Sequence, residues 1–298
     1  MRVAVAMLLG TEKDEPGRGR PKTITAKQVA EIVRMTTQET PPNATQWSTR
    51  DMGKAAEVSA STVRRIWQEH GLKPHRTRTF KLSRDPEFAE KLANVVGLYL
   101  NPPANAIVLS CDEKSQIQAL DRTQPSLPFR SGRLKTVTHD YKRNGTSTLF
   151  AALNTLTGQV LSMCAPRHRH QEWLRFLQMI DRETPVDLEL HVIADNYGTH
   201  KHARVKSWLK RHPRFQMHFT PTSSSWLNMV ERVFRDITTK RIRSGAFPSV
   251  AALVKAIENY IAEHNLDPKP FIWTAKAGDI LAKVTRARAA LANKTPSA

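Results

Sequence analysis

Residues 191–231 read HVIADNYGTHKHARVKSWLKRHPRFQMHFTPTSSSWLNMVE, and the rest of the chain can be interpreted around them. The apolar run at residues 190–194 predicts a buried strand that carries Asp195 at its C-terminal end. Apolar residues at helical spacing close the stretch and predict a helix that carries Glu231. A strand and a nearby helix can hold two carboxylates close enough to share a divalent metal ion, because neither backbone can drift.

The predicted helix around Glu231 has one apolar face. Its members recur at helical spacing: Leu227, Val230, Phe234 and Ile237. The serines among residues 221–225 are expected to cap the first turn. A single glutamate in a helix is usually a solvated surface residue. Asn228, close before Glu231 and beside the apolar face, favours a functional site instead.

A third carboxylate follows another apolar run. Residues 106–111 predict a strand buried on both faces, and Asp112 and Glu113 come directly after it. An acid at a strand end is often only a turn former, so Asp112 alone is a weak signal. The three acids together form a pattern that is more specific than any one of them alone. In order along the chain, they are an acid after a strand, a second acid after a strand and a glutamate on a helix.

Composition and charge narrow the class of protein. The 298 residues, 40% of them hydrophobic, can bury a sizeable core and suggest about two domains. With 46 Lys and Arg against 27 Asp and Glu, the formal charge of +19 indicates a polyanionic partner. Two cysteines exclude a disulfide scaffold and fit a reducing cytoplasm. No segment approaches the roughly 20 apolar residues of a membrane helix.

Three helices are predicted near the N-terminus, at residues 25–34, 48–57 and 62–71. A helix, a short turn and a second helix with polar and basic residues on its N-terminal half are typical of a helix-turn-helix, whose second helix enters the major groove. The candidate DNA contacts on this half are Ser61, Thr62, Arg64 and Arg65. A plain helical hairpin is the alternative interpretation.

A basic, turn-rich segment precedes these helices. Residues 17–22 read GRGRPK, and the core of this segment resembles the hook that lies in the narrow minor groove of A·T-rich DNA. The extended side chains of Arg18 and Arg20 suit the strong negative potential of that groove. A flexible linker that happens to be basic is the alternative. Either interpretation marks a boundary in the chain.

Five motifs in one order point to a known family. They are DEKSQIQALDRTQP, THDYKRNGT, RHRHQEWLRFL, ADNYGTH and FTPTSSSWLNMVERVF. Together they resemble the DDE transposases of bacterial insertion sequences in the mariner superfamily, and the resemblance covers roughly residues 21–281. It implies that Asp112, Asp195 and Glu231 are the catalytic acids and the ligands of two Mg²⁺ or Mn²⁺ ions. It places His200 near this site, with Asn228 in support, although a surface position for His200 is the alternative.

The resemblance also implies an α/β fold. The predicted elements continue with a helix over residues 85–100, hairpin strands at 148–153 and 160–163, a helix over 171–184 and a strand at 216–219. Their order matches a ribonuclease-H-like domain, a mixed five-stranded sheet with helices in which three antiparallel strands precede two parallel ones. A small all-α helix-turn-helix domain is expected before it.

The expected domains are a basic linker or remnant at residues 1–22, the helix-turn-helix at 23–80, the catalytic domain at 85–285 and a tail at 286–298. Members of the resembled family usually carry a further helix-turn-helix before the Gly-Arg-Pro linker. Here only residues 1–9 stand in its place, which predicts a chain shortened at the N-terminus with weaker recognition of element ends.

The activity that the resemblance implies is transposition of an insertion sequence. Such an enzyme nicks the terminal inverted repeats of its element and joins the freed 3′-ends to double-stranded target DNA at a TA dinucleotide. We expect a homodimer on DNA, in the bacterial cytoplasm and associated with the nucleoid, without a membrane partner. Two alternatives are a DNA-binding regulator and a metal-dependent nuclease of the same fold, each without transposition activity.

Overall fold

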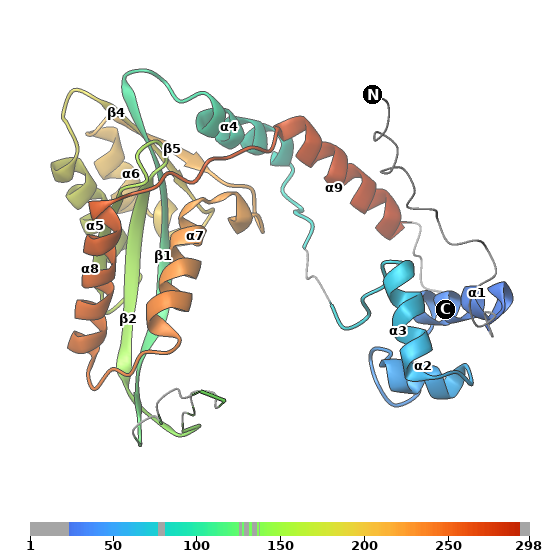
Figure 1. Cartoon of the computed structure of the whole chain (residues 1–298). Helices are drawn as coiled ribbons and strands as arrows, with labels where there is room; N and C mark the ends of the chain where they lie inside the picture. The colour runs from blue at the N-terminus through green and yellow to red at the C-terminus, as the bar shows by residue number, and fades with distance from the viewer. Residues whose placement is uncertain are drawn as a thin grey trace, which may run out of the picture. The chain divides into compact units, whose positions relative to one another are not determined.

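The structure, a computed structural model, describes residues 24–76, 81–124, 127, 131–132, 136 and 138–292. The chain divides into two compact units, Met1–Phe80 and Lys81–Ala298. Figure 1 labels most of the helices and strands of both units. The predicted basic linker, with Arg18 and Arg20, lies outside the described residues.

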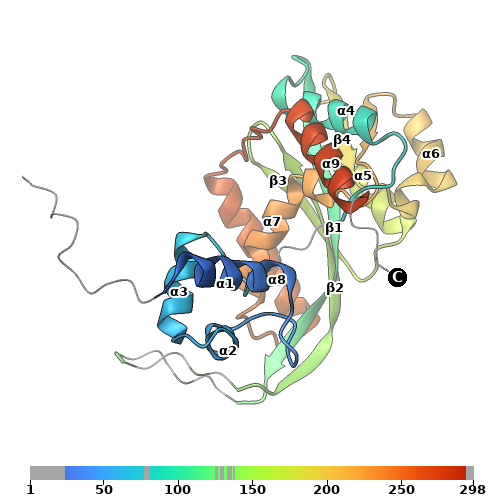
Figure 2. The same ribbon diagram turned by 90° about the vertical axis from the view of Figure 1, so that its right-hand side faces the viewer.

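The described part of the first unit consists of three helices, α1 (Ala26–Gln38), α2 (Thr49–Ala55) and α3 (Ala60–Glu69). Each helix begins at a side-chain cap, which is supplied in turn by Thr25, Ser48 and Ser59. Apolar residues from all three helices and the intervening loop form a small core: Ile32, Trp47, Met52, Val63, Ile66 and Trp67. The three predicted helices are therefore present, and they pack together as one unit (Figure 2).

Helix α3 begins two residues earlier than the sequence pattern predicts. The reason is that Ser59 caps it, because the Ser59 hydroxyl accepts a hydrogen bond from the Thr62 N–H at 3.1 Å. The same hydroxyl lies 2.9 Å from the hydroxyls of both Ser61 and Thr62. Ser61 and Thr62 therefore belong to the first turn of α3 and do not precede it.

The second unit contains a mixed five-stranded sheet in the order β3-β2-β1-β4-β5. Its strands are β1 (Ala106–Arg122), β2 (Tyr141–Asn154), β3 (Val160–Ala165), β4 (Glu189–Ala194) and β5 (Phe215–Phe219). The pairs β1–β2 and β2–β3 are antiparallel, whereas β1–β4 and β4–β5 are parallel. This topology confirms the predicted sheet of three antiparallel strands followed by two parallel ones.

The predicted end of the first strand is wrong. The sequence pattern places Asp112 just after a strand, but β1 continues to Arg122, and Asp112 pairs with Ala151 of β2 inside the ladder. The polar residues after Asp112 stay in the strand because β2 supplies them with backbone partners along a long hairpin. The parallel pairing of β1 with β4 stops at the Ser110–Ile193 pair. Asp112 thus lies just beyond the parallel part of the sheet.

Alternation along β2 sends side chains into two separate cores, one on each face of the sheet. Leu149, Ala151 and Leu153 pack on one face against α7 (Val230–Ile237) and α8 (Val250–Leu266). Phe150 and Ala152 pack on the other face with the buried residues of α5 (His170–Glu183) and α6 (Ala203–Lys210): Trp173, Phe176, Leu177, Ile180, Val205 and Trp208. A sheet covered on both faces explains why the strand sequences are almost continuously apolar.

The remaining helices complete the second unit. They are α4 (Phe88–Leu100), α5 (His170–Glu183), α6 (Ala203–Lys210) and α9 (Ala277–Ala292). Helix α9 packs against α4, and it continues past residue 285, where the sequence pattern places the end of the catalytic domain. Among the described residues, no helix combines the length and the apolar character that a membrane span requires.

Candidate active site

The side chain of Asp112 is held by Asn228. Asp112 is 8% exposed, and the Asn228 amide donates hydrogen bonds to the Cys111 carbonyl oxygen at 2.8 Å and to Asp112 Oδ2 at 3.4 Å. The Asn228 Oδ1 atom accepts a short hydrogen bond from the Ser110 hydroxyl. Every polar group of this buried amide is therefore used to join the start of α7 to the centre of β1.

The start of α7 is capped by the sheet and not by the preceding serines, so the predicted serine cap is wrong. The residue before the helix, Met229, makes no side-chain cap. Instead, the first helical N–H, on Val230, donates to the Ser110 hydroxyl at 3.3 Å. Tyr99 of α4 donates its phenolic hydrogen to the Leu227 carbonyl oxygen at 2.9 Å. These long-range bonds fix the helix that carries Glu231.

Glu231 lies in the first turn of α7, and its side chain is exposed. The protein around the carboxylate still displaces part of its water, which raises the pKa of Glu231; nearby Lys114 lowers it and the charge of Asp195 raises it further, with a net upward shift. Asp195 follows the end of β4, as predicted. Glu231 and Asp195 thus lie within electrostatic reach of each other although they come from different elements.

His200 lies in the short helix η1 (Gly198–Lys201) and is 1% exposed, so the alternative surface position is wrong. Its Nδ1 atom is 3.0 Å from Asp195 Oδ1, and its Nε2 atom is 3.1 Å from Glu113 Oε2. Burial alone would lower the pKa of His200, but the close carboxylates of Asp195 and Glu113 overcome this effect and raise the pKa to about 10. His200 is therefore buried between two carboxylates, which favour its protonated form.

One oxygen of Asp195 lacks a satisfactory donor. The better-oriented contact of His200 Nδ1 is with the main-chain oxygen of Asp195 at 3.2 Å. Asp195 Oδ1 is close to the imidazole but receives no hydrogen bond of acceptable geometry from the described residues, and it is buried. A buried carboxylate oxygen without a donor is costly unless a cation compensates it.

The three predicted acids repel one another. Burial raises the pKa of Asp112 to about 8, and the charges of Asp195, Glu113 and Glu231 act in the same direction. Among the described residues, no three His, Cys, Asp or Glu side chains already converge as a ready-made metal-binding group. The structure thus brings the acids into electrostatic contact without closing them around a common point.

The candidate DNA contacts lie on one side of α3. Arg64 and Arg65 are exposed, as is Ser61, and Thr62 is half-buried. The opposite side of this helix packs into the core of the first unit through Val63, Ile66 and Trp67. A helix with one buried side and one exposed basic side has the amphipathic form that a recognition helix requires.

Family comparison decides the class of this chain. Residues 108–254 match the family model of the DDE superfamily endonucleases, and residues 8–67 match the model of a homeodomain-like domain. The region of the chain that carries the three acids therefore matches the DDE superfamily of endonucleases. The endonuclease match includes Asp112, Asp195 and Glu231, and the homeodomain-like match includes all of the predicted contacts on α3.

One relative is an uncharacterized 39 kDa protein of insertion element IS630 from Shigella sonnei. It is 25% identical over 205 residues, which are 69% of this chain and 59% of that protein. The chain thus matches less than two thirds of the length of this relative.

Solved structures of Mos1 transposase share the fold. The paired-end complex with the left transposon end has a TM-score of 0.56 at 15% identity and covers 84% of this chain and 74% of Mos1. The paired-end complex with Mn has a TM-score of 0.57 at 15% identity, over 84% and 75% of the two chains. The complex with Mg has a TM-score of 0.54 at 14% identity, over 87% and 77%. Identities this low establish the likeness of fold alone.

This DDE-family site also contains polar residues that the sequence pattern did not single out. Glu113 is one, because alternation along β1 turns it to the face opposite Asp112, where it reaches His200. Ser110 and Tyr99 are the others, and both bind the backbone around Asn228. The acid pair at 112–113 was a visible signal for Glu113, whereas Ser110 and Tyr99 sit in apolar runs that resemble ordinary core.

Proposed function

We propose that this chain is a DNA transposase, which binds the ends of an insertion element and carries out metal-dependent strand cleavage and strand transfer. The observation that carries the proposal is the placement of Asp112 on β1, Asp195 at the end of β4 and Glu231 on α7, all within the region that matches the DDE superfamily. The charge of Asp195 raises the pKa of both other acids. Hydrolysis and transfer at phosphate by two metal ions use carboxylates assembled in this way.

The donor set fits a divalent cation. Carboxylate oxygens are the ligands that Mg²⁺ and Mn²⁺ prefer. Among the described residues the buried Asp195 Oδ1 accepts no hydrogen bond of good geometry, although the His200 imidazole lies 3.0 Å away. The acids repel one another until a cation neutralises them. Two metal ions would be held by Asp112, Asp195 and Glu231. The Mos1 complexes of similar fold contain Mn in one case and Mg in the other. When bound, such ions activate a water or 3′-hydroxyl and stabilise the leaving oxygen.

The other residues of the site act as positioning groups in this proposal. Asn228 holds Asp112 against the start of α7, which also sets the place of Glu231. His200 holds Asp195 from the buried side, and Glu113 anchors the second nitrogen of that imidazole. Carboxylates whose orientation is fixed by hydrogen bonds lose less entropy when they bind metal and substrate.

DNA binding is assigned to the first unit. The exposed side of α3 would enter the major groove, and Arg18 and Arg20 of the basic linker would follow the minor groove. We further propose a homodimer that acts on terminal inverted repeats and on TA target sites, on nucleoid DNA in the bacterial cytoplasm. The net charge of +19 supports a polyanionic partner, and one of the Mos1 structures contains a transposon end.

The test of the proposed function is a cleavage and joining assay on DNA that carries the element's own ends. We expect nicking and strand joining in Mg²⁺ or Mn²⁺ and neither reaction after chelation with EDTA, because the carboxylates alone cannot activate the nucleophile. Readdition of Mg²⁺ should restore both products on a sequencing gel. A DNA-binding regulator would shift the ends without cutting them, and a simple nuclease would cut without joining, so either result would contradict the proposal.

Replacement of Arg64 and Arg65 by alanine is expected to weaken binding to element ends. Each lost phosphate contact should reduce by about 0.9 the steepness with which the logarithm of the DNA association constant falls with the logarithm of salt concentration. For the double variant this slope should therefore fall by about 2. Gel shifts over a salt series measure this slope. Lys27→Ala on the exposed side of α1 is the matched control and should leave the slope nearly unchanged. Unchanged affinity of the double variant would assign α3 to a structural helical hairpin.

A further inference from the structure

A basic cavity lies in the second unit, apart from the three acids. Its volume is about 690 Å³, and it is formed by the segment that begins the unit, the loop before η2 (Ser225–Leu227) and helix α9. Its polar lining consists of three cations and three hydroxyl-bearing residues: Lys81, Arg84, Arg288, Ser83, Thr222 and Ser223. None of Asp112, Asp195 and Glu231 lines it.

The charge of this cavity is not compensated locally. None of the described residues that line it is a carboxylate. Within the described part of the chain, neither Lys81 nor Arg84 nor Arg288 forms an ion pair with an acid. Guanidinium groups and hydroxyls are the donors that recognise the tetrahedral oxygens of phosphate. A concave site with these donors and no acid has the chemistry of a phosphate pocket.

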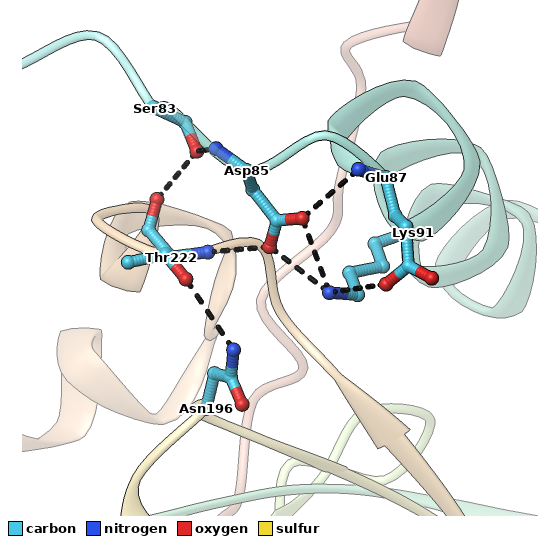
Figure 3. Close-up of polar contacts among 6 residues, drawn as sticks. All are labelled: Ser83, Asp85, Glu87, Lys91, Asn196 and Thr222. Atoms are coloured by element: carbon cyan, nitrogen blue, oxygen red, sulfur yellow. Dashed lines mark hydrogen bonds and ion pairs between the residues drawn. The ribbon is translucent and has the colours of Figure 1, made fainter.

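The cationic wall on α9 is held in place by a main-chain contact. The Nη2 atom of Arg288 donates to the Ser83 carbonyl oxygen at 3.0 Å. The Ser83 hydroxyl in turn donates to the Thr222 carbonyl oxygen at 2.6 Å, which joins the first segment to the loop (Figure 3). Arg288 uses one of its five N–H donors in this contact, and no other contact of its guanidinium group is found among the described residues, so the remaining donors can meet a ligand.

The floor of the cavity is braced by a buried carboxylate. Asp85 accepts hydrogen bonds from the Thr222 N–H at 3.1 Å and the Glu87 N–H at 3.0 Å, and Lys91 pairs with it at 3.0 Å (Figure 3). Burial raises the pKa of Asp85, but the bonds from Lys91, Thr222 and Glu87 together hold it below the usual value. The loop is thus tied to a charged group that cannot easily move, and the cavity keeps its shape.

The same loop contacts the segment that carries a catalytic acid. The Thr222 hydroxyl accepts a hydrogen bond from the Asn196 amide at 3.3 Å, and Asn196 directly follows Asp195 (Figure 3). A ligand bound by Lys81, Arg84 and Arg288 would therefore rest on a loop that is hydrogen-bonded to the active-site segment. This connection distinguishes the cavity from an isolated patch of surface charge.

We propose that Lys81, Arg84 and Arg288 form a binding pocket for one backbone phosphate of double-stranded DNA. The proposal rests on the proposed function, because it takes DNA as the ligand of the second unit. A phosphate contact carries no sequence information, but it fixes the register of the duplex. Through the loop at Thr222, the pocket would set the position of the DNA backbone relative to Asp195.

The test compares two double variants that lose the same charge. Arg84→Gln with Arg288→Gln removes two cations of the pocket, whereas Lys283→Gln with Arg286→Gln removes two exposed cations of α9 that do not line it. Fluorescence anisotropy with a labelled random-sequence duplex over a salt series gives the slope of log K against log salt for each full-length chain. We expect the pocket variant to lose about 1 from the slope and the control to lose much less.

The outcomes separate this inference from the proposed function. If the unmodified chain does not bind the duplex, the proposed function fails and the pocket fails with it. If the unmodified chain binds and the two double variants lose the same slope, or neither loses any, the proposed function stands and the pocket is overturned. Arg84→Gln alone removes none of the hydrogen bonds that hold the walls. If circular dichroism shows that the double variant is unfolded, the single variant Arg84→Gln takes its place in the test. An unchanged slope for Arg84→Gln would also overturn the pocket.

Discussion

Asp112→Asn, Asp195→Asn and Glu231→Gln are each expected to reduce strand cleavage by about a thousandfold or more, while the affinity for element ends changes less than about twofold. The amide keeps the shape of the side chain but removes the charge that a divalent cation needs. The three acids come from different elements and already interact through their charges, so none can take over the role of another. Single-turnover cleavage in Mg²⁺ and gel shifts on the same ends measure the two effects.

A matched control for these variants lies on the same helix as Glu231. Asp236 is a carboxylate of α7 that pairs with its neighbour Arg235, and it has no contact with the acids. Asp236→Asn should therefore cleave at nearly the rate of the unmodified chain. If one of the three acid variants cleaves at a comparable rate, that residue does not belong to the site. If the variants also lose DNA affinity, the acids contribute to folding or binding and the assignment to catalysis alone is wrong.

Asn228→Ala is expected to have the next largest effect, with cleavage reduced by about 10- to 100-fold. The free energy of unfolding should fall by about 1–3 kcal/mol, because the Ser110 hydroxyl and the Cys111 carbonyl oxygen lose their buried partner. The loss of activity has a separate cause, since Asp112 loses the amide that orients it. Urea denaturation gives the stability, and cleavage at saturating Mg²⁺ well below the melting temperature gives the activity.

Asn265 provides the control for this second prediction. Its side-chain amide also makes two partly buried hydrogen bonds, one with the N–H and one with the carbonyl oxygen of Val160, both at 2.9 Å. Asn265 lies on α8, which does not carry any of the three acids. Asn265→Ala should lower stability by a similar amount and leave cleavage nearly unchanged. If Asn228→Ala and Asn265→Ala lower stability alike and neither slows cleavage, Asn228 is a structural residue and does not position Asp112.

Several features of this chain were predictable from local sequence. The apolar runs at residues 106–111 and 190–194 mark strands that are buried on both faces, because such strands must be apolar throughout. Ser48 caps a helix as predicted, since capping depends on neighbours within a few residues. The order of strands and helices, together with the family resemblance, predicted the mixed five-stranded sheet. The strands and the cap depend on contacts that are short in sequence or on the alternation of side-chain direction.

Tertiary structure alone decided how the acids are held. Asp112 lies within β1 because a partner strand further along the chain continues the pairing, and no pattern within residues 106–122 reveals that partner. Ser110 caps α7, and Asn228 reaches back to β1, across more than a hundred residues of sequence. His200 is buried between Asp195 and Glu113 because the end of β4 lies beside the middle of β1. Local periodicity therefore determined the elements and the candidate acids, whereas the hydrogen bonds that orient those acids depend on long-range register, which only the folded sheet specifies.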